Sequence, residues 1–269
     1  MQLVPKFKEE HAAAIESFLS HHLAASGRSC LVLGMSGGLD SSVVARLCAK
    51  AVGPAKVLGL MLRDELTDAM DIEDVRDWAR SLKIRLREMD ISPMIDTFRT
   101  GLGLKKGDRR ALGNIRARCR MIVVYDTAAA ENGLVVGTSN KSELLSGYFT
   151  KFGDGGADFL PIGDLYKTQV RQLARALGIP RRILEKTPTA GLWKGQTDEA
   201  ELGIDYDELD RILLGMELQI EPGDIVRKTG LGIAKVTKVE RLVASSVHKR
   251  KTPLIPKLGI RTVGLDWRE

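Results

Sequence analysis

The most chemically suggestive stretch of the sequence is GMSGGLDSS, residues 34–42. Its glycines let a backbone approach a phosphate closely, and its serines add hydroxyl donors. It lacks the lysine of the G-x-x-x-x-G-K-[ST] nucleotide loop, and it carries Asp40, whose charge repels phosphate. Asp40 fits there if Mg²⁺ binds the carboxylate and the phosphates together. The alternative is helix capping by Ser36 or Asp40. Because an apolar run precedes the stretch, we favour a phosphate site.

The elements around this stretch predict where it lies in a fold. SCLVLGM (29–35) predicts a buried strand, and apolar residues at helical spacing follow from Leu39 to Ala51, so the stretch joins a strand to a helix. Further strands are predicted at 56–62, 83–90 and 134–137, with helices between them. This alternation predicts an α/β fold with a doubly wound parallel sheet and a helical C-terminal extension. Ligands are then expected at the carboxyl ends of the strands.

We expect a single domain over residues 1–269, because no linker or repeat divides the chain. Glycine and aspartate accumulate over 146–161, which predicts an ordered loop, and residues 187–205 are also predicted to be a loop. The predicted parts are an N-terminal helix over 9–25, a nucleotide-binding α/β core over about 28–190, a helical C-terminal part over about 191–250 and a tail over 251–269.

Composition restricts the class of protein. The chain has 41 Lys and Arg against 35 Asp and Glu, a net charge of +6 that suits anionic ligands such as nucleotides as readily as nucleic acid. Cys30, Cys48 and Cys119 are widely spaced without a C-x-x-C pair, which favours a reduced cytoplasmic chain and argues against structural zinc. No apolar run approaches membrane-spanning length, so we expect a soluble, untargeted protein without a membrane partner.

Several motifs together resemble a known family. SGGLDSS resembles the S-G-G-x-D-S pyrophosphate loop of the N-type ATP pyrophosphatases. GNIRARCRM, VVGTSNKSE, GYFTKFGDGGADFLPIGDLYKTQVRQLA, PTAGLWKGQTDEAELGIDYDELD and HKR resemble, in this order, the ammonia-dependent NAD⁺ synthetases over about residues 30–250. The resemblance implies an adenine nucleotide alpha hydrolase-like fold and a homodimer. It also implies ATP-dependent amidation of deamido-NAD⁺ by ammonia through an acyl-adenylate, giving NAD⁺, AMP and pyrophosphate.

The resemblance implies roles for residues of the ATP and metal site. Asp40 and Glu143 would hold Mg²⁺, and Asp40, Glu143, Lys167 and Asp158 would be catalytic. Glu143 also completes a capping box with Asn140, which is the alternative for that residue. Lys167 is predicted in the first turn of a helix, where a cation opposes the macrodipole, and this favours a functional role. The implied ATP-binding residues are Gly34, Met35, Ser36, Gly37, Gly38, Leu39, Asp40, Ser41, Thr138, Lys167 and Thr189.

The implied contacts to deamido-NAD⁺ leave alternatives open. Arg118 shares a helical stripe with Ile115, Ile122, Tyr125 and Ala129, whereas Arg116 and Arg120 do not, so Arg118 could instead be a snorkelling arginine. His248 and Lys249 could be favourable cations at a helix C-terminus. Asp158 is a possible base for ammonium, but a bound water or the product phosphates would serve as well. The implied dinucleotide contacts are Arg118, Lys151, Asp158, His248 and Lys249.

Two other functions have less support in the sequence, and one segment departs from the family pattern. An RNA-thiolating member of the superfamily needs a sulfur-carrying cysteine, and none of the three cysteines lies in a suggestive motif. Residues 224–243 faintly resemble a helix-turn-helix, although such helix pairs are also ordinary packing units, and we expect no nucleic-acid partner. The three cysteines fit small core positions, and the loop begins at residue 34, so ammonia rather than glutamine is the expected nitrogen donor. MLRDELTDAM (61–70) departs from the family, which leaves the adenine and ribose contacts open.

Overall fold

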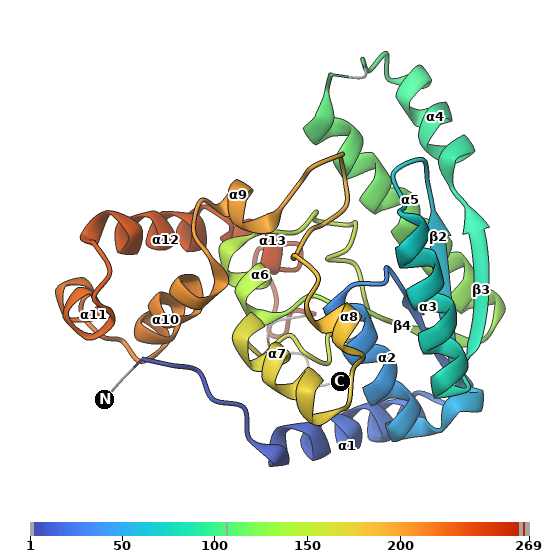
Figure 1. The fold of residues 1–269 in the computed structure, drawn as a ribbon, viewed down its shortest axis with the longest axis horizontal. Helices are drawn as coiled ribbons and strands as arrows, with labels where there is room; N and C mark the ends of the chain where they lie inside the picture. The colour runs from blue at the N-terminus through green and yellow to red at the C-terminus, as the bar shows by residue number, and fades with distance from the viewer. Residues whose placement is uncertain (1–2, 106, 264–265, 267–269) are drawn as a thin grey trace.

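The computed structural model describes residues 3–105, 107–263 and 266. Its centre is a four-stranded sheet in the order β3-β2-β1-β4, and all three strand pairs are parallel (Figure 1). The chain moves outward from β1 to β3 and then returns to β4, so the order reverses between β1 and β4, where such sheets bind ligands. The prediction of a doubly wound parallel sheet is confirmed. The strands are β1 (Cys30–Gly34), β2 (Val57–Arg63), β3 (Arg85–Asp90) and β4 (Gly133–Val136).

Helices cover both faces of the sheet because its central strands, β1 and β2, are apolar on both sides. Leu31 and Leu33 pack toward one face and Val32 toward the other, as alternation along a strand requires. The first face is covered by α1 (Glu9–Ser26), α2 (Leu39–Val52), α3 (Ala69–Leu82), α7 (Lys167–Ala176) and α8 (Arg181–Leu184), with the short 3₁₀ turn η1 (Pro54–Lys56) after α2. The second is covered by α4 (Ser92–Gly101) and α5 (Arg109–Ala130).

A second group of helices follows the sheet domain and has a core of its own, seen on the left of Figure 1. Tyr206, Leu209 and Val236 are fully buried there, and Leu3 near the N-terminus packs into the same cluster. The helical C-terminal part is therefore confirmed, but the loop predicted over 187–205 contains a short helix capped by Thr197. The remaining helices are α6 (Lys141–Ser146), α9 (Asp198–Leu202), α10 (Tyr206–Glu217), α11 (Pro222–Thr229), α12 (Ile233–Ser245) and α13 (Val247–Arg250).

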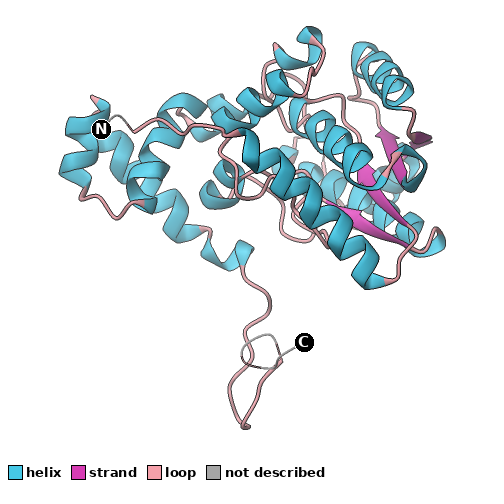
Figure 2. Cartoon of the chain, turned by 90° about the horizontal axis from the view of Figure 1, so that it is seen from below, coloured by secondary structure: helices cyan, strands magenta, loops and turns pink. Residues whose placement is uncertain are grey.

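The two irregular segments of the chain differ in how they are held. Between α6 and α7 the prediction of an ordered loop is confirmed: Phe159 bridges to Val136, and a Cβ at Gly155 would lie 2.5 Å from the Phe149 ring. After α13 the chain leaves the body of the molecule (Figure 2), and Leu258 and Ile260 are more than 90% exposed. Residues 264, 265 and 267–269 of the predicted tail lie outside the described residues. None of the helices described combines the length and apolarity needed to cross a bilayer.

Candidate active site

The stretch 34–42 forms a rigid turn at the carboxyl end of β1. Met35 N–H donates to the carbonyl of Leu60 (2.8 Å), and the Ser36 and Ser41 hydroxyls lie 3.2 Å apart. Gly37 has φ +78°, a conformation that favours glycine. The N-cap of α2 is Gly38 and no side chain caps it, so the alternative of helix capping by Ser36 or Asp40 is not what the structure shows. The free N–H groups of the first turn of α2 remain available to an anion.

A cavity of about 770 Å³ opens at this turn, at the carboxyl ends of β1, β2 and β4. Its volume lies within the usual range for small-molecule sites. Most of the predicted ATP-binding residues meet here, although they come from four separate parts of the chain. The predicted residues in its wall are Gly34, Met35, Ser36, Gly38, Leu39, Asp40, Ser41, Thr138, Glu143, Lys167, Thr189, His248 and Lys249. Four predicted residues are not part of this wall: Gly37, Arg118, Lys151 and Asp158.

Lys167 joins the two predicted metal carboxylates. Its Nζ lies 2.5 Å from Asp40 Oδ2 and 3.6 Å from Glu143 Oε1, although the three residues are far apart in sequence. Burial alone would lower the pKa of Lys167, but the Asp40 and Glu143 carboxylates raise it above its ordinary value. Lys167 is only 4% exposed, so this charge is committed to the cavity. The prediction that it sits in the first turn of a helix is confirmed.

Glu143 forms the capping box that the sequence gave as one alternative, and its geometry leaves the second carboxylate oxygen for the other. Its Oε2 accepts the Asn140 N–H (3.2 Å), while Asn140 Oδ1 accepts the Glu143 N–H (3.1 Å), so the capping box is present. The other carboxylate oxygen, Oε1, is directed to Lys167. Burial, and then the charge of Asp40, raise the pKa of Glu143 above that of an ordinary carboxyl group. A cation bound beside this pair would relieve their repulsion.

The carboxylate oxygens of Asp40 and Glu143 suit a hard divalent cation that phosphate oxygens bind at the same time. Asp40 Oδ1 is buried and has no hydrogen-bond partner, which leaves one carboxylate oxygen unsatisfied beside the turn at 34–42. Mg²⁺ prefers such oxygens and usually keeps water and substrate phosphates as its other ligands. Within the described residues no group of three or more His, Cys, Asp or Glu side chains forms a complete metal cage. Asp40 and Glu143 would therefore hold the ion together with a ligand.

The helical C-terminal part positions this centre through Asp210. This residue of α10 is fully buried, and its Oδ2 accepts hydrogen bonds from the Thr168 N–H (2.8 Å) and hydroxyl (2.7 Å). Its Oδ1 accepts from Ser142, whose hydroxyl oxygen in turn accepts the Lys167 N–H (2.9 Å). Asp210 thereby fixes the N-termini of α6 and α7, which carry Glu143 and Lys167. Burial raises the pKa of Asp210 to about 6.

The arginines of α5 are arranged differently from the sequence prediction. Arg118 and Ile122 lie on the exposed side of the helix, whereas Arg116 is 6% exposed, so the predicted apolar stripe was wrong. Arg116 is buried because it pairs with Asp64 (3.4 Å) and with Glu65. Arg120 also pairs with Asp64 (2.9 Å) and lines the cavity near the end of β2.

Three of the predicted dinucleotide contacts, Arg118, Lys151 and Asp158, lie outside the cavity wall. Arg118 donates to the carbonyl of Lys151 (3.3 Å), and Lys151 Nζ donates to the carbonyl of His248 (2.7 Å). Asp158 Oδ2 accepts the Val135 N–H (2.7 Å), which ties the loop to β4. This carboxylate is engaged at the strand end and does not line the cavity, so its position does not favour the role of a base.

His248 and Lys249 reach the cavity from α13. His248 is exposed, and its Nδ1 lies 3.1 Å from the carbonyl of Ser245. Lys249 Nζ donates to the carbonyls of Gly147 (2.7 Å) and Phe149 (2.8 Å), and so binds α13 to the glycine-rich loop. Burial, and then the positive charge of Arg110, lower the pKa of Lys249. Both residues lie on a separate short helix, not at the end of α12.

A cluster of hydrogen-bonded polar side chains near the same cavity was not predicted from the sequence. Tyr148 donates to Glu201 (2.6 Å), Gln196 donates to the same carboxylate oxygen (2.7 Å), and Tyr206 donates to Asp198 (3.0 Å). Asp198, Glu201 and Gln196 fall within QTDEAELGID, a string that carried the resemblance without a role for any one residue. The sequence signal that could have pointed to these three residues is that they all lie in one motif. Only the fold places them in the wall with Lys167.

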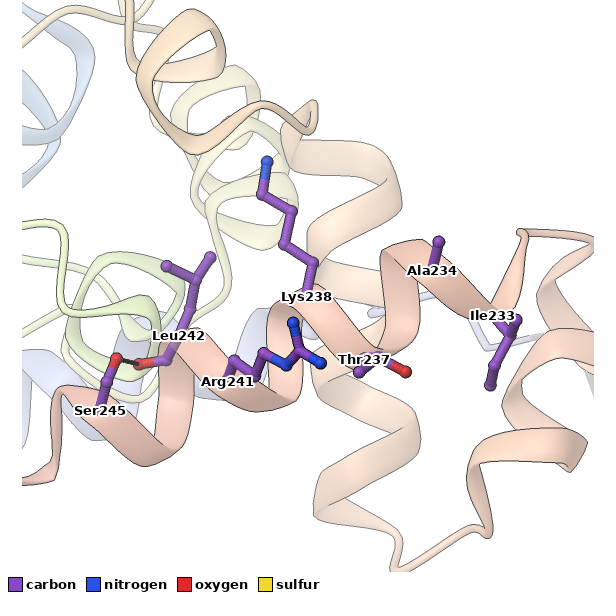
Figure 3. A pocket seen from close by; sticks show the side chains of 7 residues that line it. All are labelled: Ile233, Ala234, Thr237, Lys238, Arg241, Leu242 and Ser245. Atoms are coloured by element: carbon purple, nitrogen blue, oxygen red, sulfur yellow. Dashed lines mark hydrogen bonds between the residues drawn. The ribbon is translucent and has the colours of Figure 1, made fainter.

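The predicted helix pair over 224–243 is present as α11 and α12. A groove of about 490 Å³ runs along α12 and is lined by side chains of this helix, among them Lys238 and Arg241. Figure 3 shows these side chains. Val236 and Val239 on the same helix are fully buried in the C-terminal core. Leu242 and Ser245 also line the large cavity, so the second helix helps to build the site and is an ordinary packing unit.

The fold is a doubly wound α/β domain, and its switch point holds a glycine-serine turn, two facing carboxylates and a buried lysine. These features define a nucleotide-binding protein suited to polyphosphate chemistry. The NAD synthase family model matches residues 11–253, and the chain belongs to this family.

The individual comparisons agree with that family. The NH(3)-dependent NAD(+) synthetase of Thermococcus kodakarensis is 48% identical over 92% of this chain and 98% of its own. Two solved structures superpose over 93% of this chain and 98% of theirs. An NMN synthetase from Francisella tularensis has a TM-score of 0.81 at 33% identity, and an NH3-dependent NAD synthetase from Campylobacter jejuni has 0.78 at 28%.

Proposed function

We propose that the cavity binds ATP with Mg²⁺ and joins ammonia to the nicotinate carboxyl group of deamido-NAD⁺. The chain is an ammonia-dependent NAD⁺ synthetase, a ligase of NAD biosynthesis. The observation that carries the proposed mechanism is the meeting of Asp40, Glu143 and Lys167 beside the turn at 34–42.

Activation of the substrate is needed because ammonia cannot expel oxide from a carboxylate. In the proposed first step the nicotinate carboxylate attacks the α-phosphorus of ATP, and pyrophosphate leaves with the bonding electrons. In the second step ammonia attacks the acyl carbon, AMP leaves, and one proton is released. The products are NAD⁺, AMP and pyrophosphate, and no protein nucleophile takes part.

Each residue contributes charge or orientation to these steps. The N–H groups at the start of α2 bind phosphate oxygens, and Lys167 neutralises the charge that builds up on the leaving pyrophosphate. Asp40 and Glu143 hold the cation, which when bound screens the phosphates and polarises the phosphorus centre. Thr138 and Thr189 position ATP from the carboxyl end of β4 and from the segment after α8.

We propose that the dinucleotide extends from the cavity across the outer surface. Arg118, Lys151 and Asp158 lie there, on the side where Ile122 is 49% and Phe152 58% exposed. A second copy of the chain covering this apolar surface would complete the substrate site, which supports a homodimer. The proposal includes a cytoplasmic location, since the three buried cysteines need no oxidising compartment.

The deciding experiment incubates the purified chain with Mg-ATP, ammonium and either deamido-NAD⁺ or nicotinic acid mononucleotide. Formation of NAD⁺, AMP and pyrophosphate in equal amounts from the dinucleotide supports the proposal. Preference for the mononucleotide would assign the chain to NMN synthesis, which the similarity to the Francisella protein makes the relevant comparison. Release of ADP in place of AMP would overturn adenylation.

A further inference from the structure

Lys186 lies on the segment between α8 and Thr189, and three protein oxygens surround its ammonium group. Nζ donates to the carbonyl of Gly37 (3.1 Å) and to Asp71 Oδ1 (2.5 Å). It also forms an ion pair with Asp74 Oδ2 at 2.5 Å, without the angle of a hydrogen bond. With these contacts the charge of Lys186, which lines the cavity, is paired with Asp71 and Asp74, whereas Lys167 is paired with the two predicted metal carboxylates.

Asp71 and Asp74 belong to the first half of α3, which packs directly on the turn at 34–42. A Cβ added to Gly37 would lie 2.9 Å from the carbonyl oxygen of Asp71, so backbone meets backbone there. Asp71 lines the cavity, and the Asp74 side chain is 3% exposed. Arg182 pairs with Asp74 (2.5 Å) and Asp77 (2.8 Å), and so neutralises only part of this acidic group.

The carboxylates of Asp71 and Asp74 repel an anion bound at the turn, and so they weaken the binding of a polyphosphate there. Lys186 lies between them and the turn. Its backbone also leads to Pro188, whose carbonyl accepts the Asp198 N–H (3.1 Å), and to Thr189 in the cavity wall. One side chain therefore links the turn, α3 and the segment that carries Thr189.

We propose that Lys186 is a positioning residue for the triphosphate: it holds the carbonyl of Gly37 and neutralises Asp71 and Asp74, so that the turn accepts the charge of ATP. The inference rests on the proposed function, since it assumes that ATP is the ligand of the turn. It assigns Lys186 no contact with the reacting atoms.

The test replaces Lys186 with methionine, which keeps the length of the side chain and removes its charge. A unit charge within roughly 10 Å of a phosphate changes binding on the order of tenfold at an effective dielectric constant near 20. We expect K186M to raise the KM for Mg-ATP and the Kd of a non-hydrolysable ATP analogue about tenfold, with the KM for ammonium changed less than twofold. The matched control is K194M, which removes the charge of an exposed lysine on the same segment.

A second variant separates electrostatics from packing. In the double variant K186M with Asp71→Asn, one opposing carboxylate is removed, and we expect ATP affinity to return to within about threefold of the wild type. Loss of a merely structural contact would not be restored by removing its partner. Affinities are measured well below the melting temperature of each variant, so that partial unfolding does not contribute.

Two results would overturn the inference. One is an unchanged KM and Kd for ATP in folded K186M, and the other is a double variant no better than the single one. Wild-type NAD⁺ formation is measured in parallel: if the wild type makes no NAD⁺, the proposed function fails. If the wild type is active and K186M binds ATP normally, only the role of Lys186 fails.

Discussion

Substitution of Glu143 separates its capping function from its proposed metal function. Glu143→Gln keeps an oxygen that can accept the Asn140 N–H, now 3.2 Å from Oε2, but it loses the charge. Glu143→Ala loses both. A lost cap costs about 1 kcal/mol, which for a chain of this length lowers the melting temperature by roughly 2–4 °C. We expect that loss in the alanine variant alone, because both variants remove the carboxylate but only glutamine keeps an acceptor for the Asn140 N–H.

Activity, unlike stability, should not distinguish the two variants: we expect both to be equally impaired. If the two carboxylates hold Mg²⁺ on the phosphates, loss of one removes about 4 kcal/mol of transition-state stabilisation, or about 10³-fold in kcat/KM. The apparent constant for Mg²⁺ should rise, and excess Mg²⁺ should partly restore turnover. Glu199→Gln on α9 serves as the control, because it removes a carboxylate that does not line the cavity.

The assay couples NAD⁺ formation to alcohol dehydrogenase and follows NADH, at several Mg²⁺ concentrations and saturating ATP. Calorimetric melting of the same samples gives the stability. Near-normal turnover by Glu143→Gln would refute the metal role and leave Glu143 as a cap. Equal melting losses in the glutamine and alanine variants would refute the separation of the two functions.

Three further predictions follow from the same geometry. Arg118→Lys should raise the KM for deamido-NAD⁺ clearly while the KM for ATP changes less, because it keeps the charge and loses the planar fork; equal KM values would return Arg118 to a surface role. Asp210 has a folded pKa of about 6 against an ordinary value near 3.8, so its ionisation costs stability, which is present at low pH and lost as pH rises through 6. The stability of Asp210→Asn relative to wild type, from urea unfolding, should therefore rise by about 2–3 kcal/mol between pH 4 and pH 7.5, and a pH-independent difference would contradict this. Ammonium should support NAD⁺ formation and glutamine should not, even after replacement of Cys30, Cys48 and Cys119 by alanine, because all three are buried and burial raises the pKa of Cys48 to about 12; glutamine-driven synthesis with contaminating ammonium removed would contradict it.

The error about Arg118 shows a limit of periodicity. Ile115, Ile122 and Tyr125 repeat at helical spacing, so the sequence indicated an apolar side that includes Arg118. The buried side of α5 instead contains Arg116, because Asp64 and Glu65 from the end of β2 neutralise it. A charged residue looks exposed in a pattern unless its partner is known. That partner lies 52 residues earlier in the case of Asp64 (116 − 64).

Glu143 illustrates a different limit. The sequence presented capping and metal binding as alternatives, because a pattern assigns one residue one role. In the structure the two carboxylate oxygens point in different directions, Oε2 to the Asn140 N–H and Oε1 to Lys167. The geometry therefore allows both roles, and only measurement of activity will test the metal role.

The sequence by itself determined the local elements and their class. Apolar runs, helical spacing and the glycine-serine turn are local signals, since strand, turn and helix depend on neighbouring residues. Alternation of these elements then restricts the topology to a right-handed doubly wound sheet. Tertiary structure decided what meets at the switch point. The contact of Lys167 with Asp40, the support from Asp210 and the enclosure of Gly37 by Lys186 and Asp71 join residues tens to more than a hundred positions apart. No local pattern encodes such distances, because they depend on how the helices pack.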